Sequence, residues 1–345
     1  MEYKPILGIT IGDVAGVGPE ITAKALSKEE VYKISRPVII GDKDAIEDGL
    51  RIARKDLKAN PVNCVSDSIF EFGTIDIFDL DNISLPIEYS TIKAEYGKAA
   101  GEYIKKAIDL AMEGEIDAIV TNPIHKESFK LGGWGKKYAG HTEMLADLTG
   151  TKDYTMMLSH KDFRVVHVST HISLRDACNA VKKDRVLKTI KFAYKGCKDL
   201  GIEEPRIAVA ALNPHASDGS LFGYEEEKEI IPAINEAKKL GYKVDGPVPA
   251  DTVFSKAKGG MYDIVVCQYH DQGHIPMKFD GFQYNNKEEK WDTVSGVNST
   301  LGLPIIRTSV DHGTAFGKAG KGTATAESLL DAIDVAVKFA KNRNK

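Results

Sequence analysis

The 345-residue chain lacks the features that mark several classes of protein. No apolar run reaches the roughly 18 residues that a transmembrane helix needs, and the start from Met1 to Pro5 shows no signal-peptide pattern. There is no basic excess, since the net charge is −4, so neither nucleic acid nor a membrane is an expected partner. The four cysteines are scattered without metal-site spacing, which favours a reducing compartment. These absences together predict a soluble cytoplasmic protein.

What the chain does contain is an alternation of β-rich runs with longer amphipathic stretches. This order predicts an α/β fold with a mostly parallel sheet covered on both faces. A polar stretch over residues 279–296 is expected to form an exposed loop or hairpin. We expect strands at residues 6–11, 37–40, 75–78, 116–120, 164–168, 206–212, 263–269 and 304–307. We expect helices at residues 20–26, 98–112, 173–181, 225–240 and 328–340.

Five histidines follow expected strands, namely His125, His171, His215, His270 and His312. Ligands gather at the carboxyl ends of parallel strands, so histidines that are distant in sequence can converge there. Three neutral imidazoles with one vacant position suit zinc or a similar divalent ion. The alternative for any single histidine is an ordinary hydrogen-bonded loop residue. The pattern alone does not choose three ligands from the five.

Two small-residue loops and two basic residues suggest where anions bind. Residues 12–20 join the first strand to a helix, but they match neither a phosphate-binding Walker loop nor a dinucleotide fingerprint, and a tight turn explains them equally well. Residues 311–315 form a second such loop, which either lies against a cofactor or simply connects two elements. Lys278 and Arg307 are candidate phosphate ligands. Arg307 is the better one, because it is expected to end an apolar strand.

Ordered motifs run along nearly the whole chain. They comprise residues 12–20, 140–143, 169–171, 212–216, 249–254, 269–273, 297–304 and 307–315. Together these motifs resemble the PdxA family of 4-hydroxythreonine-4-phosphate dehydrogenases. The resemblance implies a three-layer αβα fold like that of isocitrate and isopropylmalate dehydrogenases, with two subdomains around a cleft. It also implies a homodimer with a shared active site.

The resemblance also implies which part of the chain carries each function. Residues 1–130 with 297–345 would carry the cofactor loop, and residues 131–296 would carry the metal and substrate residues with the dimer interface. The implied metal ligands are His171, His215 and His270, holding zinc or alternatively cobalt, manganese or magnesium. The implied substrate contacts are His141, Thr142, Lys278, Asn298 and Arg307. NAD or NADP would lie against Asp311, His312, Gly313, Thr314 and Ala315, with His215 and Asp251 as catalytic residues. The base would be either Asp251 or a metal-held water.

Two segments indicate which substrate is expected among those of the family. The run from Val165 to Ile172 and the triplet His274-Ile275-Pro276 are more similar to the PdxA2 branch, which is associated with D-threonate or D-erythronate 4-phosphate. The resemblance therefore implies NAD(P)-dependent oxidation of a 4-phosphorylated C4 hydroxy acid with decarboxylation. One alternative substrate is 4-hydroxy-L-threonine 4-phosphate, used in pyridoxal phosphate synthesis. Alternatives of another class are a metallohydrolase using the same histidines and a non-catalytic phosphate-binding protein.

Overall fold

The computed structural model describes residues 3–287 and 290–343, with the backbone alone of residues 290–294. The chain divides into two compact units. The first unit is Met1–Lys152 with Leu303–Lys345, and the second is Asp153–Gly302. Both boundaries come later in the chain than the expected ones after residues 130 and 296. Over the described ranges, no helix has the length and apolarity needed to cross a membrane.

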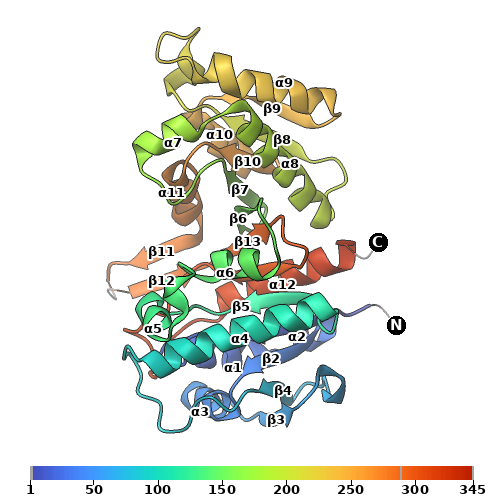
Figure 1. Cartoon of the computed structure of the whole chain (residues 1–345), viewed down its shortest axis with the longest axis vertical. Helices are drawn as coiled ribbons and strands as arrows, with labels where there is room; N and C mark the ends of the chain where they lie inside the picture. Colours follow the sequence, from blue (N-terminus) through green and yellow to red (C-terminus); the bar gives the residue numbers. More distant parts are fainter. Residues whose placement is uncertain (1–2, 288–289, 344–345) are drawn as a thin grey trace. The chain divides into compact units, whose positions relative to one another are not determined.

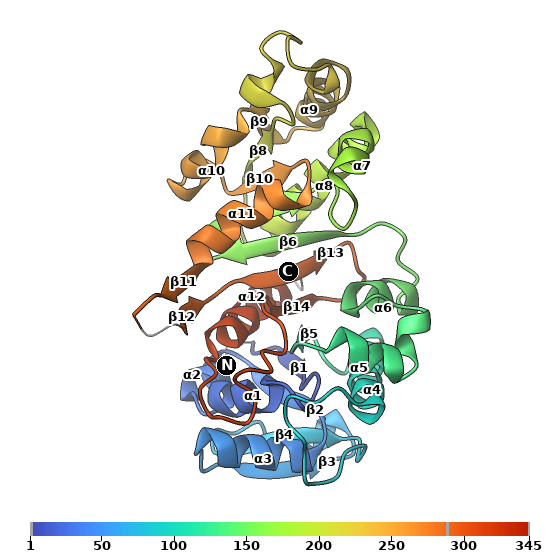
Figure 2. The same ribbon diagram turned by 90° about the vertical axis from the view of Figure 1, so that its left-hand side faces the viewer.

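The first unit is built on a parallel sheet in the strand order β3-β4-β2-β1-β5-β14. Helix α4 covers one face of this sheet, and α1 and α12 cover the other (Figure 2). The strands are β1 (Ile6–Thr10), β2 (Arg36–Gly41), β3 (Lys58–Val62), β4 (Thr74–Asp79), β5 (Ala118–Thr121) and β14 (Arg307–Val310). The helices are α1 (Gly18–Leu26), α2 (Glu29–Ile34), α3 (Lys43–Ala53), α4 (Ala94–Glu113), α5 (Lys126–Leu131), α6 (His141–Leu148) and α12 (Glu327–Arg343), with short 3₁₀ turns η1 (Val65–Asp67) and η2 (Trp134–Lys136).

The second unit has the strand order β13-β6-β7-β10-β8-β9, in which β6 runs antiparallel to both of its neighbours and the other pairs are parallel. Helices α10 and α11 cover one face and α8 the other (Figures 1 and 2). The strands are β6 (Thr155–His160), β7 (Phe163–His167), β8 (Arg206–Ala210), β9 (Lys243–Val248), β10 (Ile264–Cys267) and β13 (Val297–Leu301), beside a hairpin of β11 (Phe282–Asn285) and β12 (Lys290–Val294). The helices are α7 (Leu174–Ala180), α8 (Lys183–Asp199), α9 (Ile231–Lys239), α10 (Ala250–Lys258) and α11 (His270–Gly281), with short turns η3 (Pro214–Ser217) and η4 (Glu226–Ile230).

Central strands of both units are apolar at consecutive positions, as a sheet covered on both faces requires. In the first unit Ile39 and Ile40 of β2 are fully buried, and in the second unit Val265 and Val266 of β10 are fully buried. Side chains on both faces of each sheet therefore leave water. The α/β fold class expected from the sequence is confirmed.

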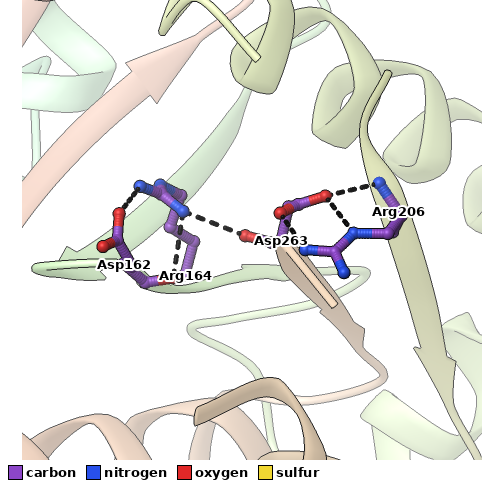
Figure 3. Close-up of polar contacts among 4 residues, drawn as sticks. All are labelled: Asp162, Arg164, Arg206 and Asp263. Atoms are coloured by element: carbon purple, nitrogen blue, oxygen red, sulfur yellow. Dashed lines mark hydrogen bonds and ion pairs between the residues drawn. The ribbon is translucent and has the colours of Figure 1, made fainter. Parts of the chain in front are cut away.

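A polar network joins the amino ends of three adjacent strands in the second unit (Figure 3). Arg206, the first residue of β8, donates from Nε and Nη2 to the carboxylate of Asp263 at 3.1 and 2.8 Å. Arg164 of β7 donates to the Asp263 carbonyl at 3.3 Å and to the Asp162 carboxylate at 2.8 Å. Because β10 begins next to Asp263, these contacts align the starts of β7, β10 and β8. The opposite ends of these strands are left for the loops that carry the candidate site.

At the level of elements, one expectation is wrong and another is confirmed. The strand expected at residues 304–307 is wrong, because Gly302 with its left-handed φ of 103° and Pro304 belong to a turn, and β14 begins at Arg307. Arg307 therefore starts a strand rather than ending one. The hairpin expected within residues 279–296 is confirmed by β11 and β12, although residues 288–289 lie outside the described ones.

Candidate active site

Three of the candidate histidines follow strands that lie side by side. Strand β10 is paired in parallel with β7 on one side and with β8 on the other. His171 follows β7, His270 follows β10, and His215 follows β8. Parallel neighbours end at the same edge of a sheet, so the topology places all three histidines at one edge. This agrees with the position expected from the sequence.

His171 and His270 come close together at this edge. Their ring centroids are 5.8 Å apart, with an angle of 45° between the planes. Nδ1 of His270 lies 2.7 Å from the carboxylate of Asp271, which can only accept a hydrogen bond when ionised. Nδ1 therefore carries the proton, and Nε2 keeps the lone pair that a cation would use. Asp271 was missed from the sequence, although its place next to His270 was a usable signal.

His215 lies on a loop with strained backbone, and the buried Glu226 carboxylate binds the start of this loop. Its backbone is left-handed at φ 53°, in a run of left-handed residues that includes Ala216. Such conformations cost energy and persist only where the surroundings enforce them. Glu226, which is 2% exposed, accepts hydrogen bonds from the backbone N–H groups of Leu212 and Asn213, both at 2.8 Å. The buried carboxylate thus fixes the entry to the His215 loop.

The donor types at this edge fit a divalent metal, but the arrangement is incomplete. Within the described part of the chain, no three His, Cys, Asp or Glu side chains are grouped closely enough to hold a metal ion. The rings of His171 and His270 lie close together, whereas the His215 ring lies near the Phe222 ring, at 6.4 Å between centroids. The tautomer of His270 still suits coordination through Nε2.

Two glutamines tie the ends of β10 and β8 together beneath the histidine loops. The side-chain amide of Gln268 donates to the Ala210 carbonyl at 2.7 Å, and that of Gln272 donates to the Ala211 carbonyl at 2.7 Å. The Gln272 side-chain oxygen also accepts the Gln268 backbone N–H at 2.7 Å. Both glutamines are buried. They hold the loops of His215 and His270 on a fixed base.

In the first unit, the buried cation Arg307 lies close to the half-buried His141. Arg307 is 4% exposed, and its Nη2 donates to Oγ1 of Thr121 at 2.8 Å. Burial lowers the pKa of Arg307 to about 10, against the opposing effect of the Glu143 carboxylate. Burial, and then the charge of Arg307, lower the pKa of His141 well below its usual value. A buried guanidinium beside a neutral imidazole is suited to an anion.

His141 is also the first residue of α6, and Thr142 follows it in the first turn. Nε2 of His141 is buried and has no hydrogen-bond partner among the described residues. A buried polar atom without a partner is costly, so this atom is a candidate contact for a ligand. The N–H groups of the first turn of a helix add further donors for an anion.

The remaining expected substrate contacts, Lys278 and Asn298, belong to the second unit. Lys278, in the last turn of α11, holds its ammonium 4.3 Å from the ring centroid of Phe282. Asn298 donates from Nδ2 to the sulfur of Met156 at 2.8 Å, while its Oδ1 is buried without a hydrogen-bond partner among the described residues. The five expected contacts are therefore divided between the two units.

The expected cofactor loop, residues 311–315, follows β14 in the first unit. The backbone N–H of Asp311 donates to the Ser328 hydroxyl of α12 at 3.1 Å, and Nδ1 of His312 lies 2.8 Å from the Gly313 carbonyl. Ala315 is left-handed at φ 46°. Around Gly313 there is open space, because a Cβ placed there would meet no atom within 4 Å. The loop thus offers backbone that a flat ligand can approach.

The first glycine loop packs against this cofactor loop. The Val17 N–H donates to the Thr314 carbonyl at 3.0 Å, and a Cβ on Gly16 would lie 2.9 Å from the Thr314 side chain. A Cβ on Gly18 would lie 2.0 Å from the Ile11 carbonyl oxygen. These glycines are required by close backbone contact. Their arrangement supports the interpretation of residues 12–20 as a tight turn.

The remaining candidate residues are His125 and Asp251. His125 caps helix α5 by accepting the Ser128 N–H at 3.4 Å, and its ring stacks on Phe316 at 4.6 Å between centroids. This structural role separates His125 from the three strand-end histidines. Asp251 lies in the first turn of α10 with its side chain exposed. It is accessible to a ligand, and its role as a base stays a prediction.

The comparison with protein families bears on this arrangement directly. The family model described as "Pyridoxal phosphate biosynthetic protein PdxA" matches residues 33–336. The chain belongs to the PdxA family. This PdxA family member is 46% identical over 342 residues to a protein of Oceanobacillus iheyensis named "Putative D-threonate 4-phosphate dehydrogenase", with 99% of each chain covered. A Clostridium botulinum protein of the same name is 45% identical, with 98% of this chain and 97% of that protein covered.

Solved structures give the same result. A 4-hydroxythreonine-4-phosphate dehydrogenase from Burkholderia phymatum is 43% identical, with a TM-score of 0.83 over 98% of this chain and 99% of that one. The enzyme of that name from Klebsiella pneumoniae is 37% identical, with a TM-score of 0.84 over 98% and 99%. The fold of this PdxA family member is therefore that of these dehydrogenase structures.

Proposed function

We propose that the chain oxidises a 4-phosphorylated C4 hydroxy acid, D-threonate or D-erythronate 4-phosphate, with NAD or NADP as the oxidant and with loss of CO₂. The observation that carries this proposal is the likeness, at 46% identity over 99% of the chain, to a protein named for D-threonate 4-phosphate. The names of the solved structures support a second candidate substrate, 4-hydroxythreonine 4-phosphate. Both substrates place a phosphate at the same end of a four-carbon chain.

In this proposal the phosphate binds Arg307, since a buried guanidinium offers two parallel donors to phosphate oxygens. His141 stays neutral beside that charge, so its ring can donate or accept one hydrogen bond without competing for the anion. Thr142, Lys278 and Asn298 would complete the contacts and fix the substrate in one orientation. Binding energy from the phosphate thus serves to position the reacting hydroxyl.

The reaction would proceed at the strand-end histidines. A divalent cation, zinc in the first instance, would be held by His171, His215 and His270 and would supply Lewis acidity at the substrate hydroxyl. Asp251, exposed in the first turn of α10, would take the hydroxyl proton. NAD or NADP held by residues 311–315 would supply the hydride acceptor. The carbon–carbon bond to the carboxylate of the resulting 3-keto acid then breaks, CO₂ leaves, and the remaining carbon takes up a proton.

We further propose that the chain works as a homodimer. The loop or helix that follows each strand-end histidine carries exposed apolar side chains, and clustered exposed apolar side chains are typical of interaction sites. These residues are Ile172 (49% exposed), Leu174 (63%), Leu221 (71%), Phe222 (48%), Ile275 (66%) and Phe279 (89%). Sedimentation equilibrium of the full chain should give the mass of two chains, and a monomer at all concentrations would contradict this part.

The central test uses the variant His215→Ala, with His160→Gln as a matched histidine substitution in the same unit. His160 pairs with Asp280 at 2.7 Å, apart from the strand-end loops. We expect His215→Ala to lose bound metal and NADH formation from threonate 4-phosphate, and His160→Gln to keep both. Normal metal content with normal turnover in His215→Ala would overturn the proposed site. Cleavage of substrate without NADH formation would favour a hydrolase instead.

A further inference from the structure

Two segments that indicate the expected substrate, residues 165–172 and 274–276, contact each other in the structure. His167 ends β7, and His274 lies in α11, more than a hundred residues further along the chain. Their ring centroids are 4.7 Å apart, with 36° between the planes. The two segments therefore meet at this contact, next to the strand-end histidine His270.

His274 lies directly against His270. The two rings are stacked, with centroids 3.6 Å apart and planes within 9° of parallel. Nδ1 of His274 lies 3.0 Å from the backbone carbonyl of His270, and a carbonyl can only accept. Nδ1 of His274 therefore carries a proton, and this hydrogen bond fixes the ring to its own helix. A ring held in this way presents a fixed flat surface to the His270 ring.

His167 supports His274 from within the unit. Its side chain is fully buried, and its ring centroid lies 6.4 Å from that of His270. A Cβ on Gly273 would lie only 2.4 Å from Nε2 of His167 and 2.9 Å from the sulfur of Cys267. The first turn of α11 therefore needs glycine at this position to leave room for the His167 ring. The fold is built to accommodate the pair.

These contacts restrict rotation of the His270 ring. As the first residue of α11, with its side chain 37% exposed, its ring could turn about the bond to the backbone. The carboxylate of Asp271 holds one edge of the ring, and the stack with His274 holds its face. A ligand whose ring plane is fixed before binding loses less entropy when it coordinates a cation.

We propose that His274, supported by His167, is a positioning residue that holds the His270 ring in the plane required for metal binding. The inference rests on the proposed function, in which His270 is a metal ligand. Partners that orient metal-binding histidines typically contribute about 10- to 100-fold in metal affinity. The contribution of His274 should therefore be visible in metal binding itself, independently of turnover.

The test measures Zn²⁺ affinity by calorimetry and the visible absorption spectrum of the Co²⁺-loaded protein, after stripping with chelator. The variants are His274→Ala, which removes the ring, and His274→Phe, which keeps a flat ring. His160→Gln, a histidine substitution in the same unit at a side chain that pairs with Asp280, is the matched control. We expect His274→Ala to bind Zn²⁺ about 10- to 100-fold more weakly with an altered Co²⁺ spectrum. We expect His274→Phe and His160→Gln to stay near wild type.

Each other outcome has a distinct meaning. Wild-type affinity and an unchanged Co²⁺ spectrum in His274→Ala would overturn the positioning role while leaving the proposed function intact. Equal losses in His274→Phe and His274→Ala would also overturn it, because ring stacking would then not matter. Absence of Zn²⁺ and Co²⁺ binding to the wild-type chain would overturn the proposed metal site, and the inference with it. Circular dichroism of the metal-free variants shows whether each one is folded, and His274→Gln, which also removes the ring, takes the place of His274→Ala if that variant is not.

Discussion

The guanidinium of Arg307 and the imidazole of His141 lie close enough in the first unit for the charge of one to affect the other. Burial first, and the Arg307 charge second, hold the pKa of His141 well below its usual value. Both residues come from motifs far apart in the sequence, at the start of α6 and the start of β14. At neutral pH the pair therefore carries its positive charge on Arg307 alone.

Replacing Arg307 by methionine should weaken substrate binding while leaving the free energy of unfolding nearly unchanged. Charged hydrogen bonds contribute about 1.5–3 kcal/mol each, so the KM for the phosphorylated substrate should rise about 10- to 100-fold or more. The free energy of unfolding should change little, because methionine fills the buried space without the cost of burying a charge. Steady-state kinetics and urea unfolding measure the two effects.

The matched control for that experiment is Arg206→Met in the second unit. Arg206 belongs to the network with Asp263 at the amino ends of the strands, opposite the histidine loops. Its replacement should affect stability and leave the substrate KM near wild type. An unchanged KM in Arg307→Met would rule out Arg307 as the phosphate ligand.

The depressed pKa of His141 predicts how stability depends on pH. The unfolded chain protonates this histidine below about pH 6.5, whereas the folded protein keeps it neutral. Because the unfolded state then binds more protons, the free energy of unfolding falls as the pH drops below about 6.5. The slope contributed by this residue is up to about 1.4 kcal/mol per pH unit, until the pH reaches the folded-state pKa. The variant His141→Asn should lack this slope, and unfolding curves measured between about pH 7 and pH 5 compare the two. Parallel pH profiles for the two proteins would contradict the prediction.

Two glycine substitutions should separate structural from cofactor-binding glycines. In Gly18→Ala the new Cβ would lie 2.0 Å from the Ile11 carbonyl oxygen, and backbone cannot move aside cheaply, so we expect a loss of about 3 kcal/mol in unfolding free energy. In Gly313→Ala the new methyl meets no atom within 4 Å, so stability should stay within about 0.5 kcal/mol. If residues 311–315 hold the cofactor, Gly313→Ala should still weaken NAD binding by about tenfold.

Thermal unfolding and NAD titration of both variants provide the readouts. A stable Gly18→Ala would mean that the turn is less tightly packed than its geometry indicates. Wild-type NAD affinity in Gly313→Ala would move the cofactor away from this loop.

Much of the local structure could be predicted because it depends on near neighbours in the sequence. The helix expected at residues 173–181 is one example, since α7 begins at Leu174 where the Ser173 hydroxyl accepts the Asp176 N–H at 3.1 Å. The helix expected at residues 20–26 is another, observed as α1. The boundary of β14 was missed because it depends on pairing with β5, where Arg307 lies opposite Ile119. Register of this kind is set by a partner almost two hundred residues away.

The sequence by itself determined the α/β class and placed His171, His215 and His270 after strands, because alternating apolar and polar runs fix where each strand ends. Only the tertiary structure decided which side chains meet. It made His125 a helix cap stacked on Phe316, paired His171 with His270, and joined His167 to His274. The physical reason is that strand order and helix packing, not spacing along the chain, set the distances between side chains that lie far apart in sequence.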